Sequence, residues 1–258
     1  MLCKVKGIVL KAAEYGDNDK MLTLLTEEKG KMSVCVKGGR SLKSKHMPSC
    51  EIFSYSEFDL YERSGKYWVR ESFLCESFFA IRRELLNMYL GQYFCEVANE
   101  YALYDVADRD LLRLLLNSLY LLSSYKKDLR IIKCAFELRS ASIEGFMPDL
   151  SGCSYCQKES ENGYFDAIEG AFLCDVCKRK NNLVSDVYEN MNLSPVVYID
   201  KSVIDAMRFI ISAPIERVFS FNLPDQELDV LSKVCETFVA HQLERGFKTL
   251  DFYKMLSY

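Results

Sequence analysis

Four cysteines in the second half of the chain have the residue type and spacing of a metal site. They form two C-x-x-C pairs separated by 17 residues, Cys153 with Cys156 and Cys174 with Cys177. Each pair can place two thiolates on one side of a tight turn, and two such turns complete the tetrahedron that Zn²⁺ accepts. Because four thiolates leave no open position for water or substrate, we expect one structural Zn²⁺ per chain and no chemistry at the metal.

The residues between the two pairs suit a zinc ribbon. Gly163–Ile168 and Ala171–Leu173 have the pattern of short strands around a Glu169-Gly170 turn. Disulfides, a redox dithiol and plain buried thiols are the other interpretations. A redox C-x-x-C normally occurs once, after a strand. The remaining cysteines are scattered singly, which is typical of core residues in a reducing cytosol: Cys3, Cys35, Cys50, Cys75, Cys95, Cys134 and Cys235.

The composition is that of an ordinary globular protein. The chain has 258 residues, of which 49 % are hydrophobic and 27 % charged, enough for one large or two modest domains. We find no secretory signal pattern and no apolar run of the ~18 residues that a membrane span needs. We therefore expect a cytoplasmic protein with no membrane partner. The net charge of −4, taken over the whole chain, argues against a nucleic-acid partner.

One segment departs from that acidic average. Residues 29–50 hold six Lys or Arg and no Asp or Glu. Within it, four cations surround two glycines and two serines, and these are our candidate DNA-binding residues: Lys37, Arg40, Lys43 and Lys45. Cations displace counterions from a nucleic acid, and serine hydroxyls donate to phosphate oxygens. The alternative is a solvated loop, since loops are commonly charged.

The first part of the chain has the pattern of strands broken by turns. Five β-prone runs are Leu2–Lys11, Met21–Thr26, Lys31–Lys37, Glu51–Tyr61 and Lys66–Cys75. Five short strands in about 75 residues predict a small barrel of the oligonucleotide/oligosaccharide-binding (OB) type. Aromatic residues of this barrel either fill its interior or stack on bases, and the candidates are Tyr15, Phe53, Tyr55, Tyr61, Tyr67 and Trp68.

After Ser77 the apolar residues recur at helical spacing. The expected helices are 78–86, 88–104, 108–125, 128–144, 201–212 and 224–244. Asp108, Asp128 and Asp200 occupy N-cap positions, and Gly145 follows a helix end. The predicted class is therefore α+β, with an OB-fold DNA-binding domain at 1–79. An α-helical domain follows at 80–258, with a four-cysteine zinc-binding insert at 150–181.

Residues suited to catalysis are few. The only histidines are His46 and His241, and the nucleotide-binding and nucleophile-elbow motifs are missing. We therefore expect no enzymatic activity. Arg130, Lys133 and Arg139 lie on one predicted helix, and we interpret them as a solvated face and not as a site.

The order of several short motifs is similar to that of a known family. The segments are Gly7-Ile-Val-Leu10, Glu14-Tyr-Gly-Asp17, Lys37-Gly-Gly-Arg40, Phe136-Glu-Leu-Arg139, the two C-x-x-C pairs and Phe247-Lys-Thr-Leu250. Together they resemble RecO, a family of bacterial recombination mediators, over essentially the whole chain. The tail reads Lys248-Thr249 where a Lys-Ser pair is common in that family.

The resemblance implies a role in DNA repair by homologous recombination. RecO-like proteins bind single- and double-stranded DNA and anneal strands coated with single-strand-binding protein, whose C-terminal tail is a partner. With RecR they help RecA load onto such DNA, so RecA is an indirect partner, and the implied location is the nucleoid in the cytoplasm. The four paired cysteines take the family's zinc positions, and Lys37, Arg40, Lys43 and Lys45 take its basic-loop positions. The alternative function is a non-catalytic zinc-ribbon adaptor that acts through protein–protein contacts.

Overall fold

The computed structural model describes residues 2–41, 43–180 and 195–257. The chain forms two compact units: Met1–Lys126 with Phe247–Tyr258, and Lys127–Gly246. The first contains a β-barrel and three α-helices, and the second contains helices around a small sheet that carries the four paired cysteines. The α+β class is confirmed, while the domain boundaries at residues 79 and 80 stay a prediction.

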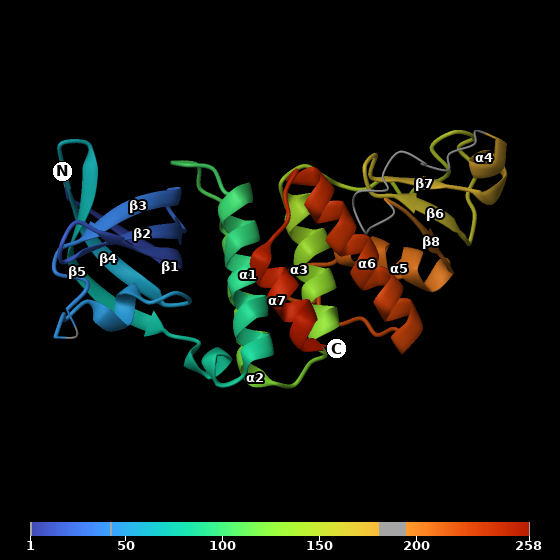
Figure 1. Ribbon diagram of the computed structural model, residues 1–258. Coiled ribbons are helices and arrows are strands. Elements are labelled where there is room, and N and C mark those ends of the chain that lie inside the picture. The colour runs from blue at the N-terminus through green and yellow to red at the C-terminus, as the bar shows by residue number, and fades with distance from the viewer. Residues whose placement is uncertain (1, 42, 181–194, 258) are drawn as a thin grey trace. The chain divides into compact units, whose positions relative to one another are not determined.

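A closed five-stranded barrel forms the N-terminal part of the first unit (Figure 1). Its strands are β1 (Leu2–Tyr15), β2 (Asp19–Thr26), β3 (Gly30–Val36), β4 (Tyr55–Arg63) and β5 (Lys66–Glu76). Their order around the barrel is β1-β2-β3-β5-β4, with β4 paired to β1 and a parallel contact between β3 and β5. This is the OB barrel that the sequence predicts.

Alternation of side chains fills the barrel. One residue in two along each strand points inward, and Val5, Leu22, Val34 and Phe58 are among those buried in its core. The predicted start of the fourth strand at Glu51 is wrong. Residues Met47–Cys50 form a 3₁₀ turn, and Phe53 has a left-handed backbone with φ of 72°, so regular pairing begins only at Tyr55.

Three helices belong to the same unit. They are α1 (Leu85–Tyr101), α2 (Arg109–Ser124) and α7 (Lys248–Ser257), and the segment predicted as a helix at 78–86 is a 3₁₀ turn at Phe79–Arg83 before α1. The N-cap at Asp108 is confirmed, since its carboxylate accepts a hydrogen bond from the Leu111 amide at 2.9 Å. None of the predicted helices covers α7, which lies beside α1 (Figure 1).

Aromatic contacts hold α7 on α1. The rings of Tyr89 and Phe252 stack with centroids 5.3 Å apart, and Tyr93 meets Phe247 edge-on at 5.2 Å. The Thr249 hydroxyl donates to Glu96 at 3.0 Å. The helix α7 thus packs with α1, although about 150 residues separate them in the sequence.

The turn between β2 and β3 is fastened to the segment after α1. The Lys31 amide donates to the Leu103 carbonyl at 3.1 Å, and the Lys31 ammonium donates to the Asn99 carbonyl at 2.6 Å. Gly30, with φ of 60°, approaches so closely that a Cβ atom there would lie 1.7 Å from the carbonyl oxygen of Val106. These contacts join the barrel to α1 and α2 in one unit.

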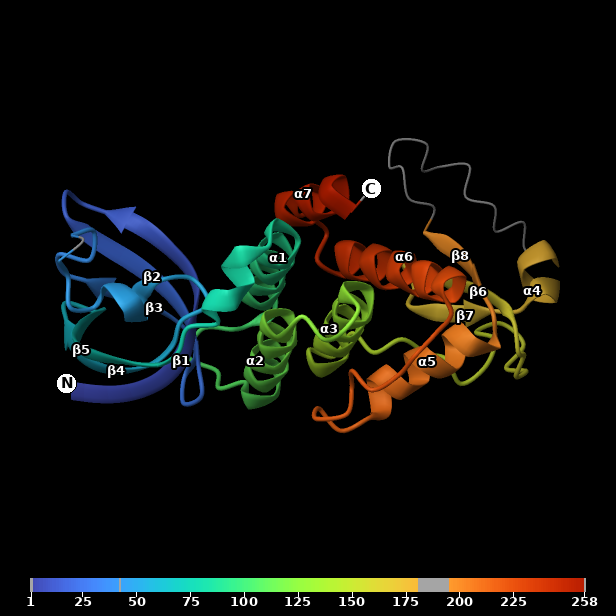
Figure 2. The same cartoon turned by 90° about the horizontal axis from the view of Figure 1, so that it is seen from below.

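The described part of the second unit packs four helices with a three-stranded antiparallel sheet. Its helices are α3 (Leu129–Ile143), the short α4 (Asp175–Lys180), α5 (Lys201–Ser212) and α6 (Asp225–Gln242). Its sheet has the order β7 (Ala171–Leu173), β6 (Gly163–Asp166), β8 (Val196–Ile199), and α6 lies next to β8 (Figure 2). The predicted hairpin of the zinc ribbon is confirmed, and β8 is an additional strand.

The interpretation of the α3 cations as a solvated face is wrong. Lys133 is buried, and its ammonium lies 3.0 Å from Glu137 and 3.3 Å from Glu236. Burial alone would lower the pKa of Lys133, but the two carboxylates raise it above the ordinary value, so the lysine stays charged. Arg130 pairs with Asp128, Asp225 and Asp229 on the same unit. These cations tie α3 to α6.

Among the described residues, no helix has the length and apolar character that crossing a bilayer would require.

Replacing Gly30 tests the contact between the barrel and the segment after α1. Gly30→Ala should destabilise the protein by about 2–5 kcal/mol, since a left-handed alanine costs about 1–2 kcal/mol and the clash with Val106 adds about 1–3 kcal/mol. Gly16→Ala is the matched control, because Gly16 has φ of 57° with nothing within 4 Å of its added Cβ. Denaturant unfolding measures both, and equal losses would contradict the close approach.

Candidate metal centre and nucleic-acid interface

A closed turn presents the first two thiols. The Gln157 amide donates to the Cys153 carbonyl at 2.8 Å, and Gln157 takes a left-handed backbone with φ of 60° that completes the turn. The Cys153 amide donates to Lys158 at 3.0 Å, and the Ser154 amide donates to Phe172 of β7 at 2.9 Å. The first pair is therefore attached to the hairpin that carries the second.

The second pair sits where the hairpin ends. Cys174 directly follows β7 and Cys177 lies in α4, whose Lys178 amide donates to the Cys174 carbonyl at 3.0 Å. The β6–β7 turn passes through Gly170 with φ of 62°, which returns the chain to the first pair. The four sulfur atoms all lie within 4.8 Å of one another, so the structure brings the predicted ligand set together.

The thiols of Cys153 and Cys177 differ in acidity. Burial alone would raise the pKa of Cys153, but hydrogen bonds from the backbone amides of Cys174, Cys156 and Tyr155 outweigh it and lower that pKa to about 6. Burial and the neighbouring sulfurs raise the pKa of Cys177 to about 12. Four thiolates this close repel one another, so full ionisation near neutral pH requires a cation between them. The donor set can hold a metal ion and is consistent with zinc.

The hairpin is anchored on the helices of its own unit. The buried ring of Phe165 meets Phe238 of α6 edge-on, with centroids 5.8 Å apart. The Asp149 amide donates to Gly170 at 2.8 Å, and the Phe172 amide donates back to Asp149 at 3.2 Å. A metal held by the two C-x-x-C pairs would therefore stabilise the packing of the hairpin in this unit.

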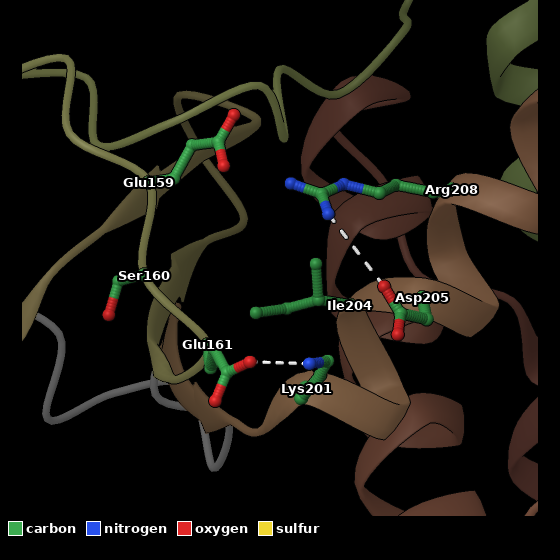
Figure 3. A pocket seen from close by; sticks show the side chains of 7 residues that line it. All are labelled: Glu159, Ser160, Glu161, Lys201, Ile204, Asp205 and Arg208. Carbon is green, nitrogen blue, oxygen red and sulfur yellow. Dashed lines mark hydrogen bonds and ion pairs between the residues drawn. The ribbon is translucent and has the colours of Figure 1, made fainter.

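A cleft of about 220 Å³ lies between the metal-binding segment and α5 (Figure 3). Ile204 points into it, and its charged lining residues are largely paired: Lys201 with Glu161, and Arg208 with Asp205 at 3.7 Å. Arg208 also donates to the Leu150 carbonyl at 2.6 Å. Through these contacts α5 is attached to the metal-binding segment along the cleft.

The basic segment is an ordered loop whose first half is docked on the β1–β2 turn. The Gly38 amide donates to the Asp19 carboxylate at 2.8 Å, and the Arg40 amide donates to the Asn18 carbonyl at 3.1 Å. The Arg40 guanidinium donates to the Asp17 carbonyl at 3.0 Å and pairs with Glu14 at 3.2 Å. Arg40 is therefore engaged with the protein itself.

The second half of the loop is a run of tight turns. The Ser44 amide donates to the Ser41 carbonyl at 2.9 Å, and the Ser41 hydroxyl accepts from the Lys43 amide at 3.3 Å. Its far end is fixed by His46, which is buried and shares a hydrogen bond of 2.9 Å with Ser72 of β5. Burial, then the nearby Lys45 charge, lowers the pKa of His46, so its imidazole is neutral at pH 7.

The loop presents its lysines to solvent. Lys37, Lys43 and Lys45 are exposed, whereas Arg40 is held as described. The backbone of the described part of the loop is hydrogen-bonded at both ends, and whether its lysines bind phosphate or are only solvated stays a prediction.

A third loop reaches the same end of the barrel. Lys66, the first residue of β5, donates from its ammonium to the Tyr15 hydroxyl at 2.9 Å and lies 5.4 Å from that ring's centroid. Tyr15 stands between Glu14 and Asp17 in sequence, the two residues that Arg40 contacts. The β1–β2 turn, the basic loop and the β4–β5 turn thus converge, and in OB barrels the β1–β2 and β4–β5 loops are the ones that bind oligonucleotides.

The aromatic candidates separate by burial. Phe53 is buried and is excluded as a stacking surface, whereas Tyr15, Tyr55, Tyr61, Tyr67 and Trp68 are half-buried. The Tyr67 ring carries the Lys29 ammonium at 4.9 Å from its centroid. Sequence reasoning missed Lys66 and the Glu14–Arg40 pair, because both depend on barrel closure and no local pattern marks them.

Comparisons with known proteins agree over the whole length of the chain. Residues 1–78 match the family model described as Recombination protein O N terminal, and residues 82–251 match Recombination protein O C terminal. The "DNA repair protein RecO" of Acetivibrio thermocellus is 30 % identical over 254 residues, covering 98 % of this chain and 96 % of that protein. The protein of the same description from Caldicellulosiruptor bescii is 27 % identical over 257 residues, covering 99 % of each chain. The chain belongs to the RecO family of DNA repair proteins.

Proposed function

We propose that this chain is a non-enzymatic DNA-binding recombination mediator. It binds single- and double-stranded DNA, promotes annealing of complementary strands and, with RecR, helps RecA load onto DNA coated with single-strand-binding protein. The observation that carries the proposal is the basic loop of the barrel, which is ordered by its backbone and exposes Lys37, Lys43 and Lys45. Membership of a DNA repair family supports it.

The loop is suited to phosphates and not to base edges. Lysine ammonium groups release counterions when they neutralise phosphates, and this term is independent of sequence. The hydroxyls of Ser41 and Ser44 accept local hydrogen bonds from the Lys43 and His46 amides, so each can still donate its own hydrogen to a phosphate oxygen. A strand held by its backbone keeps its bases available for pairing, which is what annealing requires.

The metal in this proposal is one structural Zn²⁺ held by Cys153, Cys156, Cys174 and Cys177. Its charge would allow the four crowded thiols to ionise together and would fix the β6–β7 hairpin against α6. Four thiolates fill a tetrahedral zinc, so the ion has no position for a substrate.

The remaining parts of the proposal follow the family resemblance. RecR and the C-terminal tail of single-strand-binding protein are the proposed partners, and the proposed location is the nucleoid in the cytoplasm. Residues 1–79 would act as the DNA-binding domain, with residues 80–258 as the helical domain and 150–181 as its zinc-binding insert.

Removing two exposed lysines tests the loop. Lys43→Ala with Lys45→Ala should weaken single-stranded DNA binding roughly tenfold at 0.1 M salt and reduce the slope of log K against log salt by about 1.4, from about 0.7 per phosphate contact. Fluorescence polarisation with a labelled oligonucleotide measures both. The control removes the exposed Lys126 and Lys233, outside the barrel, with the same change of charge. An equal effect of the two double variants would show that the loop has no special part in binding.

Annealing separates the mediator from the alternative adaptor. A mediator accelerates pairing of complementary strands, also when they are coated with cognate single-strand-binding protein, and the Lys43/Lys45 double variant should be several-fold slower. An adaptor that acts through protein contacts alone would leave the annealing rate of bare strands unchanged. Quenching of a fluorophore pair on the two strands measures the rate.

Loss of one ligand tests the zinc. Protein purified without chelator should hold one Zn²⁺ per chain, and Cys153→Ser should reduce this content strongly and lower the Tm by on the order of 10 °C, because metal binding contributes directly to folding. Cys75→Ser, at an exposed cysteine of β5, is the control. Elemental analysis and thermal unfolding report the two quantities. Full metal content in Cys153→Ser would rule out this ligand set.

A further inference from the structure

The Arg40 end of the basic loop differs from the lysine end in one respect. Its guanidinium already holds a carboxylate, that of Glu14, at 3.2 Å. A guanidinium presents the same donors to a carboxylate and to a phosphate, so Glu14 stands where a phosphate oxygen would be bound. Lys37, Lys43 and Lys45 are exposed on the same loop.

We propose that Glu14 is a built-in competitor of DNA at Arg40: a phosphate must displace this carboxylate before it can bind the guanidinium. This inference rests on the proposed function, because it assigns a regulatory residue to the same DNA-binding surface. Glu14 thereby sets how tightly this end of the loop holds a strand, and it favours exchange of strands over long residence.

Two observations allow Glu14 to leave without disturbing the loop. The Arg40 side chain keeps its hydrogen bond to the Asp17 carbonyl at 3.0 Å, and its amide keeps the bond to Asn18 at 3.1 Å. The guanidinium therefore stays in place when the carboxylate moves. The Glu14 side chain is 73 % exposed, so solvent can receive it once it is released.

The exchange also alters the ions that binding releases. When a phosphate of single-stranded DNA binds a cationic side chain that holds no carboxylate, about 0.7 of a counterion is released from the DNA. When Glu14 is displaced, its carboxylate lies beside the phosphate and retains a cation of its own. The net number of counterions released when a phosphate binds Arg40 is then small. The slope of log K against log salt for the unaltered protein therefore reports mainly the phosphate contacts of the lysines.

The test is Glu14→Gln, which keeps the side chain's size and removes its charge. We expect two- to fivefold tighter binding of a labelled single-stranded oligonucleotide, about the range of an exposed ion pair. The slope of log K against log salt should become steeper by about 0.7. In an Arg40→Ala background the same substitution should give no gain, because the cation it releases is gone.

Glu57→Gln is the matched control, since Glu57 is an exposed carboxylate of β4 on the same barrel and its loss changes the net charge equally. If Glu14→Gln only equals Glu57→Gln in affinity and slope, or gains as much without Arg40, the competitor is overturned. That result is distinct from failure of the proposed function. The proposed function itself fails if the unaltered protein does not bind the oligonucleotide at low salt. It also fails if the Lys43/Lys45 double variant binds as tightly as the unaltered protein. In either case the inference about Glu14 fails with it.

Discussion

The parallel contact between β3 and β5 is the constraint on which the candidate DNA-binding surface depends. It consists of two residue pairs, Val34 with Tyr67 and Cys35 with Trp68, and among the described barrel strands it is the only parallel pairing. Closing the barrel here places the start of β5 beside the ends of β1 and β3. Lys66 can then reach Tyr15, and the chain that leaves β3 must pass over the β1–β2 turn. Three loops that are far apart in sequence are gathered by this one closure.

In the second unit, the four paired cysteines would place negative charges close together if their thiols ionised. Four thiols within 4.8 Å repel one another when ionised. Burial and the neighbouring sulfurs raise the pKa of Cys177, whereas backbone hydrogen bonds lower that of Cys153. Lys133 shows the complementary solution, because one buried ammonium is neutralised by Glu137 and Glu236 from two helices. A buried charge with one partner removed is costly, so the Lys133 cluster depends on both carboxylates and therefore on the packing of α3 against α6.

Features that depend on a few neighbouring residues could be predicted from the sequence. Contacts that form only when the barrel closes or the helices pack could not. The cysteine spacing, the helix caps at Asp108 and Asp200 and the alternation of the barrel strands depend on a few neighbouring residues. The burial of Lys133 depends on Glu236, about 100 positions away, and the pairing of Arg40 depends on Glu14 across two strands. The helix α7 is short, and aromatic contacts with α1 hold it in position. Its own hydrophobic pattern was therefore a weak signal for a helix.

The acidic average of the chain is compatible with a DNA-binding surface because electrostatic interactions in salt are short-ranged. The Debye length is about 8 Å at physiological ionic strength, so a phosphate at the basic loop interacts mainly with charges on that loop and its immediate neighbours. Residues 29–50 contribute only cations among their charged side chains, and three acids are bonded to the loop or beside it: Glu14 to Arg40, Asp19 to the Gly38 amide and Glu51 to Lys20 of β2. Each of these acids is bonded to the loop or to the strand beneath it. The local field is therefore decided by which of these acids a strand can displace, and Glu14, with the most exposed side chain of an ion pair here, is the one that yields first.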